Sequence, residues 1–400
     1  MDTRISSNMM YDQSVYLMLS RQSSINHLER QLATGQKMVS AKDNPVASGT
    51  AVGMDRILAE LEQLGANAAV AQNRLGLQEN ALTQAGEMLT RVTELTVQAN
   101  NAALSAADRK SVGAELRSIR EALLSLANST DGSSRYLFGG TVDASPPFSA
   151  INGGVVYNGD QTQRQVEIAP GSFVQDALPG SEIFMRIRTG DGTVDGAAAT
   201  GNGGQAVLTE LSRDGTGTWN GDSYTIRFTA PDAYELLDDG GGVIGSGTHA
   251  EGEDILFQGL RMRLSGTPMA GDEFSAGQAA NRDVFATIDR LAGALEMDTT
   301  TLAGRTAQQN LLQSSLRDVA RAAEKMIDAR ASGGAQLNAI DNASALREAS
   351  AITLKDSLSQ LRDLDYAEAI GQYKLESASL QAAQTIFTQM QSMSLFNMIR

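Results

Sequence analysis

The sequence predicts an α+β fold: an elongated bundle of long coiled-coil-like helices from both termini, with an inserted antiparallel β domain. The first observation is that residues typical of turns are concentrated in the middle of the chain. Of the 39 glycines 27, and of the seven prolines six, lie between residues 131 and 277, as expected for an irregular β segment. Both flanks are instead rich in Ala, Leu and Gln, which favour helices. The third observation is a long apolar repeat at alternating steps of three and four residues, which is typical of a coiled coil.

That repeat runs from Met54 to Ala99, and only Gln78 and Thr96 interrupt it. It predicts one helix over residues 45–100, which would be about 84 Å long at 1.5 Å per residue. A compact globule of this chain length would be only about 55 Å across. We therefore expect an elongated molecule.

Local signals mark where the helices begin and end. The helix-start motif is Asp43, Asn44 and Pro45, because a polar side chain can cap a helix whose first residue is proline. Ser105 and Asp108 resemble a capping box that begins a second helix, which ends near residue 128. In the last third we predict helices over residues 283–297, 302–331 and 336 to near the C-terminus, the last two being separated at residues 332–334 (Ser-Gly-Gly).

The middle of the chain alternates between apolar and polar residues over short stretches. This alternation predicts strands at residues 165–168, 183–188, 224–228 and 260–264. Between residues 141 and 280 there are 19 acidic and 7 basic residues, a net charge of −12. Such a charge suits a face that stays in solvent.

We divide the chain into five segments. They are an N-terminal assembly helix (1–44), the N-terminal half of a helical rod (45–145), a variable, Gly-rich, acidic β domain (146–279), the C-terminal half of the rod (280–362) and a C-terminal assembly helix (363–400).

Both ends of the chain carry apolar stripes, largely at heptad spacing. The stripes can pair with each other or with neighbouring copies as a bundle, or each can pack on the helices of its own molecule. Periodicity leaves these arrangements open. The candidate residues for self-assembly or partner contact are Tyr11, Met18, Ile25, Leu32, Tyr366, Ile370, Tyr373, Leu380, Phe387, Met390, Leu395 and Phe396.

Several motifs resemble those of the bacterial flagellin family. The N-terminal signature of flagellins is similar to residues 32–37 (LATGQK) and 40–45 (SAKDNP), and their C-terminal region to residues 334–338 (GAQLN) and 363–369 (DLDYAEA). Three further motifs resemble a hook–filament junction subunit of this family more than the filament subunit, and they are residues 4–11, 134–140 and 394–397. The resemblance covers both flanks and leaves out the middle.

The resemblance implies a structural subunit that joins the flagellar hook to the filament and assembles through its terminal helices. It implies export without a cleaved signal peptide, through a channel passed by unfolded protein, and an extracellular location. The implied partners are other copies of the chain in a lateral ring, the first hook-associated protein, flagellin, the transient filament cap protein and a cytoplasmic export chaperone. The net charge of −15 argues against a nucleic-acid partner, and no apolar run is long enough for membrane insertion.

Composition argues against an enzyme. The chain has no Cys and only two His residues, which excludes thiol chemistry and gives little support to a Ser/His triad. We interpret the G-x-G-x-x-G pattern at residues 240–245 and the calcium-loop-like residues 191–196 as turns, since the flanking elements or carboxylates are missing. His249, near Glu251 and Glu253, leaves a weak cation site open. We expect no catalytic residue, no metal and no cofactor.

Two other functions fit parts of the same sequence. One is a filament-forming flagellin. The other is a surface ligand-binding module, in which the acidic β domain recognises a ligand on a helical stalk. Deleting residues 150–275 would discriminate, because a binding module would lose its activity and a junction subunit would still attach a filament.

Overall fold

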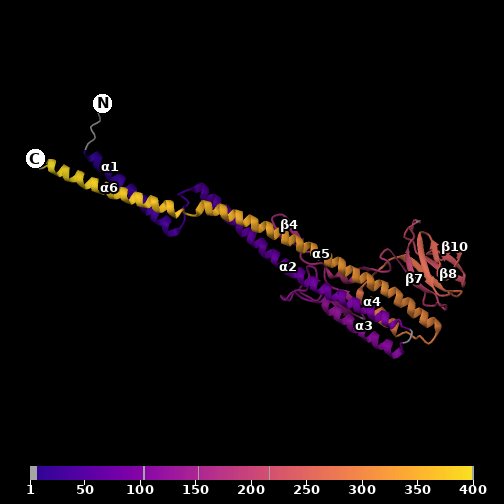
Figure 1. Cartoon of the computed structure of the whole chain (residues 1–400). Helices are drawn as coiled ribbons and strands as arrows, with labels where there is room; N and C mark the ends of the chain where they lie inside the picture. Colours follow the sequence, from indigo (N-terminus) through magenta and orange to yellow (C-terminus); the bar gives the residue numbers. More distant parts are fainter. Residues whose placement is uncertain (1–6, 102–103, 152, 216, 399–400) are drawn as a thin grey trace. The chain divides into compact units, whose positions relative to one another are not determined.

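A computed structural model describes residues 7–101, 104–151, 153–215 and 217–398, with side chains described from residue 9 to residue 390 within these ranges. The chain divides into two compact units: unit 1 is residues 1–66 and 344–400, and unit 2 is residues 67–343. The predicted α+β fold is confirmed, because long helices come from both ends of the sequence and antiparallel strands come between them (Figure 1).

Four helices build unit 1. They are α1 (Ser7–Thr34), the first part of α2 (Pro45–Ala99), the last part of α5 (Leu302–Arg362) and α6 (Tyr366–Met398). Helices α1 and α6, from opposite ends of the sequence, lie side by side (Figure 1).

The predicted helix break at residues 332–334 is wrong. Helix α5 continues through this stretch to Arg362, and the chain breaks instead at residues 363–365. A glycine inside a helix costs only about 1 kcal/mol relative to alanine. Burial of Ala329 and Ile340 on either side of the glycines is enough to offset that cost.

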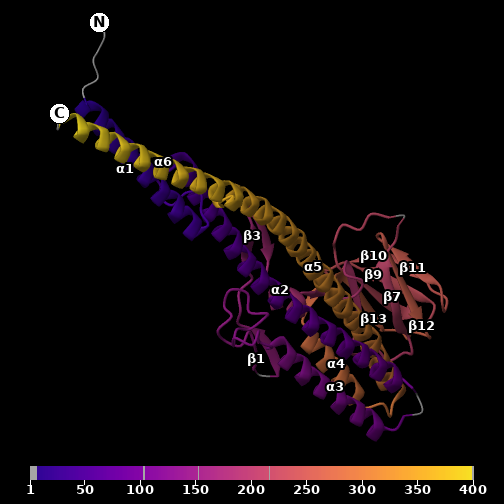
Figure 2. The same cartoon turned by 60° about the vertical axis from the view of Figure 1, so that its left-hand side comes forward.

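In unit 2 the rest of α2 and α5 pack with α3 (Ala106–Ala127) and α4 (Val284–Leu295), and Figure 2 shows α3 and α4 side by side. The predicted capping box is confirmed. The Ser105 side chain accepts a hydrogen bond from the Asp108 backbone N–H, and the Asp108 carboxylate accepts one from Ser105.

The apolar seam of α2 is buried at its predicted positions from residue 61 to residue 99. The prediction is wrong at Ile57, which is 44% exposed. Gln78 interrupts the seam but is satisfied, because its amide donates to the Leu178 carbonyl (3.0 Å) and accepts from the Leu178 N–H (3.1 Å). The Thr96 hydroxyl is satisfied within its own helix.

The strands are β1 (Phe148–Ile151), β2 (Gly154–Tyr157), β3 (Gln165–Ala169), β4 (Ser172–Gln175), β5 (Ile187–Arg188), β6 (Val194–Ala198), β7 (Val207–Arg213), β8 (Tyr224–Ala230), β9 (Ala233–Leu237), β10 (Val243–Thr248), β11 (Asp254–Phe257), β12 (Leu260–Ser265), β13 (Glu273–Gln278) and β14 (Asn281–Arg282). The larger sheets have the orders β10-β9-β8-β13-β6 and β11-β12-β7. Their described pairings are all antiparallel.

Three of the four predicted strands are confirmed, as β3, β8 and β12. The fourth, residues 183–188, is mostly wrong. A turn of π-helix, η1 (Ser181–Met185), precedes the short β5. The consecutive residues Ile183 and Phe184 are both buried, which a strand does not allow when only one of its faces is covered.

The predicted β domain over residues 146–279 contributes to three described cores, and in one of them Ile168 of β3 and Val174 of β4 pack with Leu75 of α2 and Ile340 of α5. Phe148 from β1 and Phe184 from η1 pack with Phe285 of α4, at ring-centroid distances of 5.9 and 6.1 Å from that ring, in the core of the helices. The strands from β6 to β13 enclose a separate core, which includes Phe228 and Phe274. We call residues 194–278 the outer β domain.

Both glycine-rich motifs are turns. The stretch over residues 240–245 includes the β9–β10 turn, where the Gly242 N–H donates to the Asp238 carboxylate. The Asp191 carboxylate accepts from the N–H groups of Thr193 and Val194. Among the described residues, no three His, Cys, Asp or Glu side chains gather closely enough to hold a metal ion. The described helices include none that is long and apolar enough to cross a membrane.

A buried ionic cluster joins α2 to the loops of unit 2. Arg74 is 3% exposed, and its guanidinium lies 3.3 Å from Asp131, 3.7 Å from Asp143 and 3.7 Å from Asp176. Arg164 also pairs with Asp176. Burial lowers the pKa of Arg74, because desolvation disfavours the charged form. The aspartates therefore have to remain close for the cluster to be stable.

The hydroxyl of Tyr157 makes the stability of unit 2 depend on pH in the alkaline range. Its single proton is shared between the carbonyls of Asp160 (2.7 Å) and Phe138 (3.0 Å), and desolvation raises its pKa to about 12. A raised pKa means that the stabilisation is complete below pH 10, the unfolded value, and is lost as the pH rises toward about 12.

We expect the difference in unfolding free energy between the wild type and Tyr157→Phe to shrink by about 1 kcal/mol between pH 8 and pH 12, because solvent screens this half-buried side chain and reduces the effect of its raised pKa. Urea unfolding at several pH values measures it, and the phenylalanine variant serves as the reference for all other titrating groups. A difference that stays constant over this range would contradict the assignment.

Candidate assembly surface

The apolar stripes of the two ends meet each other in unit 1. Ile25 and Leu28 of α1 and Ala369 of α6 are buried. Farther along the pair, the ring centroids of Tyr11 and Phe387 are 5.2 Å apart. The structure therefore shows the arrangement in which the two terminal stripes pair within one chain.

Two polar contacts set the register of this pair. Arg21 of α1 lies 2.6 Å from the Glu376 carboxylate of α6, and the Tyr373 hydroxyl donates to Glu29 at 3.2 Å. Both contacts are at the surface, where an ion pair contributes at most about 1 kcal/mol. They orient the helices, and most of the stability of the pair has to come from the few buried apolar side chains.

Backbone hydrogen bonds connect the loop after α1 to the end of α5. The Lys37 N–H donates to the Arg362 carbonyl (2.7 Å), and the Leu364 N–H donates to the Gly35 carbonyl (3.0 Å). Arg362 also forms an ion pair with Asp55 of α2. These contacts hold together the two described non-helical segments of unit 1, residues 35–44 and 363–365.

The helix-start motif lies at the end of the loop between α1 and α2. The Asn44 side chain accepts from the Ala47 N–H at 3.0 Å, so Asn44 caps α2, which begins at Pro45. The Asp43 carboxylate accepts from the backbone N–H of Ser40 (2.8 Å) and from that of the preceding residue. The bond from Ser40 is the main reason that the pKa of Asp43 is lowered.

Gly35 ends α1 in a left-handed conformation, with φ of +69°. We expect Gly35→Ala to destabilise the α1–α6 pair by about 1–2 kcal/mol, the cost of this conformation for a residue with a Cβ. The added Cβ would meet the Tyr366 hydroxyl at 2.8 Å, but this exposed side chain can turn away.

Hydrogen exchange of the α1 amides measures the effect of Gly35→Ala. Gly49→Ala is the matched control, because this helical glycine has open space around it and should gain roughly 0.5–1 kcal/mol. Equal exchange of α1 in the two variants would contradict the prediction.

The outer faces of unit 1 are unusually apolar. Among the described residues, 15 of the 27 exposed large apolar side chains belong to this unit, although it contains less than a third of the chain. Tyr16, Leu19 and Leu375 are 75%, 65% and 68% exposed. The others are Met9, Met10, Tyr11, Leu17, Val46, Val52, Ile57, Leu346, Ile352, Tyr366, Ile370 and Ile386. Apolar surface of this extent is typical of a site of protein association.

The predicted interface residues fall into three groups. Ile25 is buried, whereas Tyr11, Tyr366 and Ile370 are exposed. The half-buried ones are Met18, Leu32, Tyr373, Leu380, Phe387 and Met390. The side chains of Leu395 and Phe396 lie outside the described residues, as do residues 4–6.

The heptad pattern found mainly the contact between α1 and α6. It missed Tyr16, Leu19 and Leu375, which lie on the outer faces of these helices. The available signal was that large apolar residues occupy more than one face of α1, whereas a helix that packs on one side only carries a single apolar stripe.

The comparisons with known proteins agree with this architecture. Residues 5–143 match the bacterial flagellin N-terminal helical region. Together with the long terminal helices and the inserted β segment, the match defines a flagellin-type structural protein of the bacterial flagellum.

More specific relatives share nearly the whole chain. The Salmonella typhimurium flagellar hook-associated protein 3 is 27% identical over 99% of this chain and 100% of its own length. The crystal structure of Xanthomonas campestris FlgL is 56% identical, with a TM-score of 0.73, and covers 76% of this chain and 99% of its own. A hook-associated protein 3 structure from Legionella pneumophila has 27% identity and a TM-score of 0.74, covering 77% of this chain and 98% of its own. The chain belongs to the FlgL family, the family of flagellar hook-associated protein 3.

Proposed function

We propose that the chain is an extracellular structural subunit that joins the flagellar hook, through the first hook-associated protein, to the flagellin filament. Its curated relatives from Salmonella typhimurium and Escherichia coli are named flagellar hook-associated protein 3. A Legionella pneumophila relative with a TM-score of 0.70 and 27% identity is described as a flagellar junction protein. These names favour a junction subunit over a filament-forming flagellin or a ligand-binding module.

The observation that carries the proposal is the exposed apolar surface of unit 1. A large apolar side chain contributes about 1.5–3 kcal/mol when it passes from solvent into a fully covered position. Neighbouring copies in a lateral ring would cover the outer faces of α1 and α6. Adjacent rings, formed by the first hook-associated protein on one side and by flagellin on the other, would cover the ends of these helices. Assembly then stabilises a unit that has few buried side chains of its own.

The same surface calls for protection before assembly. Exposed apolar residues on α6, such as Leu375 and Ile386, would aggregate at high concentration in the cell. We propose that an export chaperone covers the C-terminal helix, that the chain leaves the cell unfolded and without signal-peptide cleavage, and that the filament cap holds it transiently during insertion.

Complementation of a strain that lacks this gene tests the junction role. The wild-type gene is expected to restore filaments attached to hooks, and the empty strain is expected to secrete flagellin that stays unattached. Attached filaments in the empty strain would contradict the proposal. So would this chain forming the bulk of depolymerised filaments, which is the result expected of a flagellin.

A deletion within the outer β domain separates the junction role from ligand binding. Val194 and Gln278 are paired neighbours in the sheet, so a short Gly-Ser linker can replace residues 195–277. This deletion spares β1, η1 and the helical core that they complete. A junction subunit is expected to keep attaching filaments, whereas a binding module would lose its only activity.

A further inference from the structure

A pocket of about 150 Å³ lies where the outer β domain meets α4 and α5. Strand β6 and the loop that follows it form one wall, and α5 forms another. Arg290 of α4 and Arg317 of α5 line it, and we call them the pocket arginines. No Asp or Glu is among the lining residues, although the chain as a whole has a net charge of −15.

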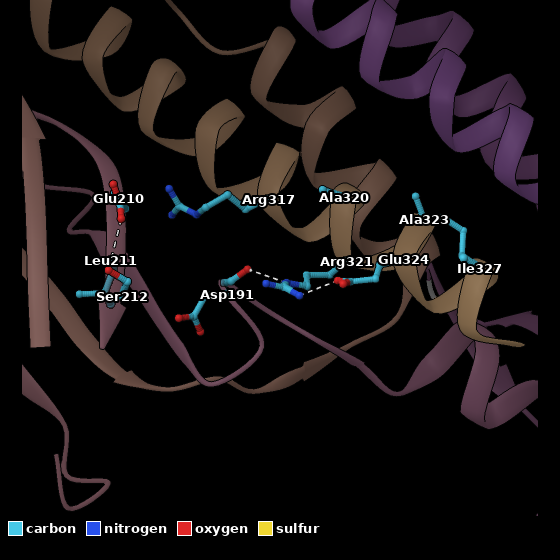
Figure 3. A pocket seen from close by; sticks show the side chains of 11 residues that line it. Asp191, Glu210, Leu211, Ser212, Arg317, Ala320, Arg321, Ala323, Glu324 and Ile327 are labelled. Carbon is cyan, nitrogen blue, oxygen red and sulfur yellow. Dashed lines mark hydrogen bonds and ion pairs between the residues drawn. The ribbon is translucent and has the colours of Figure 1, made fainter. Parts of the chain in front are cut away.

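Neither pocket arginine has a carboxylate partner in the described part of the chain. The Arg290 guanidinium makes no hydrogen bond and no ion pair with the residues described. Within the described residues, Arg317 donates only to the carbonyls of Leu208 and Thr209, both at 3.3 Å. Figure 3 shows a neighbouring pocket that shares Arg317 with this one, where the Arg317 side chain extends from α5 toward β7 and no ion pair joins it to Glu210. Most of their ten N–H donors are therefore available.

The surrounding acids do not neutralise the two arginines. Asp195 and Asp318 lie close enough to act on them through their charge. Asp318 is nevertheless paired with Arg282, and it accepts from the Gly190 N–H at 3.1 Å. This group holds three arginines and two aspartates, which leaves one positive charge in excess.

Leaving that charge unpaired has a cost. Burial lowers the pKa of both pocket arginines, in each case chiefly because desolvation disfavours the charged form. Both side chains are half-buried, so their charges are only partly solvated and gain from a charged, hydrogen-bonding partner. An anion in the pocket would supply both the charge and the acceptors.

We propose that this pocket binds a small oxyanion, held by the N–H groups of Arg290 and Arg317. Planar guanidinium groups match the oxygen pairs of phosphates and carboxylates, which they bind by two parallel hydrogen bonds. A cavity of about 150 Å³ is known to hold a molecule as large as benzene, so inorganic phosphate or a short carboxylate fits. Because the pocket walls include β6, bound anion stabilises the contact of the outer β domain with α4 and α5.

Unfolding of the full-length chain tests the site, with inorganic phosphate, acetate or chloride present at equal ionic strength. Trp219 is the only tryptophan and packs against the core of the outer β domain, so its fluorescence reports on this part. At a ligand concentration ten times the Kd, the ratio of folded to unfolded protein is expected to rise about elevenfold. A response to phosphate alone assigns an inorganic ion, and a response to acetate assigns a carboxylate.

Arg290→Gln removes the charge and retains a polar side chain. We expect it to lose the response to the anion, and to be at least as stable as the wild type in chloride, whereas a purely structural arginine would leave a less stable protein. Arg186→Gln, at an exposed position paired with Glu182, is the control and should keep the full response.

If Arg290→Gln does not fold, the variant Arg317→Gln takes its place. A phosphorus NMR titration of the folded protein then measures phosphate binding directly. The phosphate NMR signal is expected to broaden when phosphate binds to the wild type. Loss of this broadening in Arg317→Gln would support the site. An unchanged response in both arginine variants would overturn the proposal, as would a wild type that responds to neither phosphate nor acetate beyond chloride.

Discussion

The double variant Leu19→Asp, Leu375→Asp is expected to attach no filaments while losing only about 1 kcal/mol of stability in isolation, the helix-propensity cost of two aspartates. The two side chains are 65% and 68% exposed in unit 1, so the isolated chain loses little when they become polar. In the assembly each would lose about 1.5–3 kcal/mol of apolar burial. The two losses together weaken association by more than about a hundredfold, before the cost of burying a carboxylate is added.

Electron microscopy of hooks and an assay of unattached flagellin measure the effect on attachment, and thermal unfolding measures the stability of the chain. Leu19→Met, Leu375→Met is the matched control, because methionine keeps a comparable apolar area at the same places. It should attach filaments normally. Normal attachment in the aspartate variant would show that these faces stay uncovered in the flagellum.

Arg74→Met is expected to lower the unfolding free energy of unit 2 by about 3–5 kcal/mol, the usual cost of removing one partner from a buried charge cluster. Asp131, Asp143 and Asp176 lie within 3.7 Å of the Arg74 guanidinium. Arg164 remains to neutralise one of them. Arg164 and the exposed Arg135 would then face three carboxylates, of which Asp176 is fully buried, so one negative charge would be left in excess.

Urea unfolding followed by circular dichroism measures this loss. Arg135→Met is the matched control, because Arg135 contacts the same Asp143 at 3.9 Å from a side chain that is 58% exposed. Its ion pair should contribute less than about 1 kcal/mol. Equal losses in the two variants would mean that burial of Arg74 does not determine the stability of the cluster.

Features with local causes were predictable from the sequence. The start of α2 at Pro45 and the capping box at Ser105 depend on residues that are neighbours in the chain. The α2 seam depends on a repeat long enough to average out Gln78 and Thr96. Where local signals compete with packing, prediction failed. The glycines at residues 333 and 334 remain helical because flanking residues of α5 are buried.

Features that depend on distant residues were not predictable. Arg74 looks like an ordinary exposed helix residue until the loops that contain Asp131 and Asp176 fold over it. The outer apolar residues of unit 1 were missed for a related reason. A heptad pattern describes one helix face, and Leu19 and Leu375 lie on others. The pairing of α1 with α6 was one of the arrangements that the heptads left open.

Hydrogen–deuterium exchange tests most directly whether neighbours complete the terminal helices. It compares the isolated full-length chain with the same chain in purified hook–filament assemblies. In isolation, amides of α1 and α6 are expected to exchange at least about a hundredfold faster than those of α2 over residues 67–99, because few buried side chains hold them. On assembly they should become as protected as α2. Terminal helices already as protected as α2 in the isolated chain, or unchanged on assembly, would contradict the account.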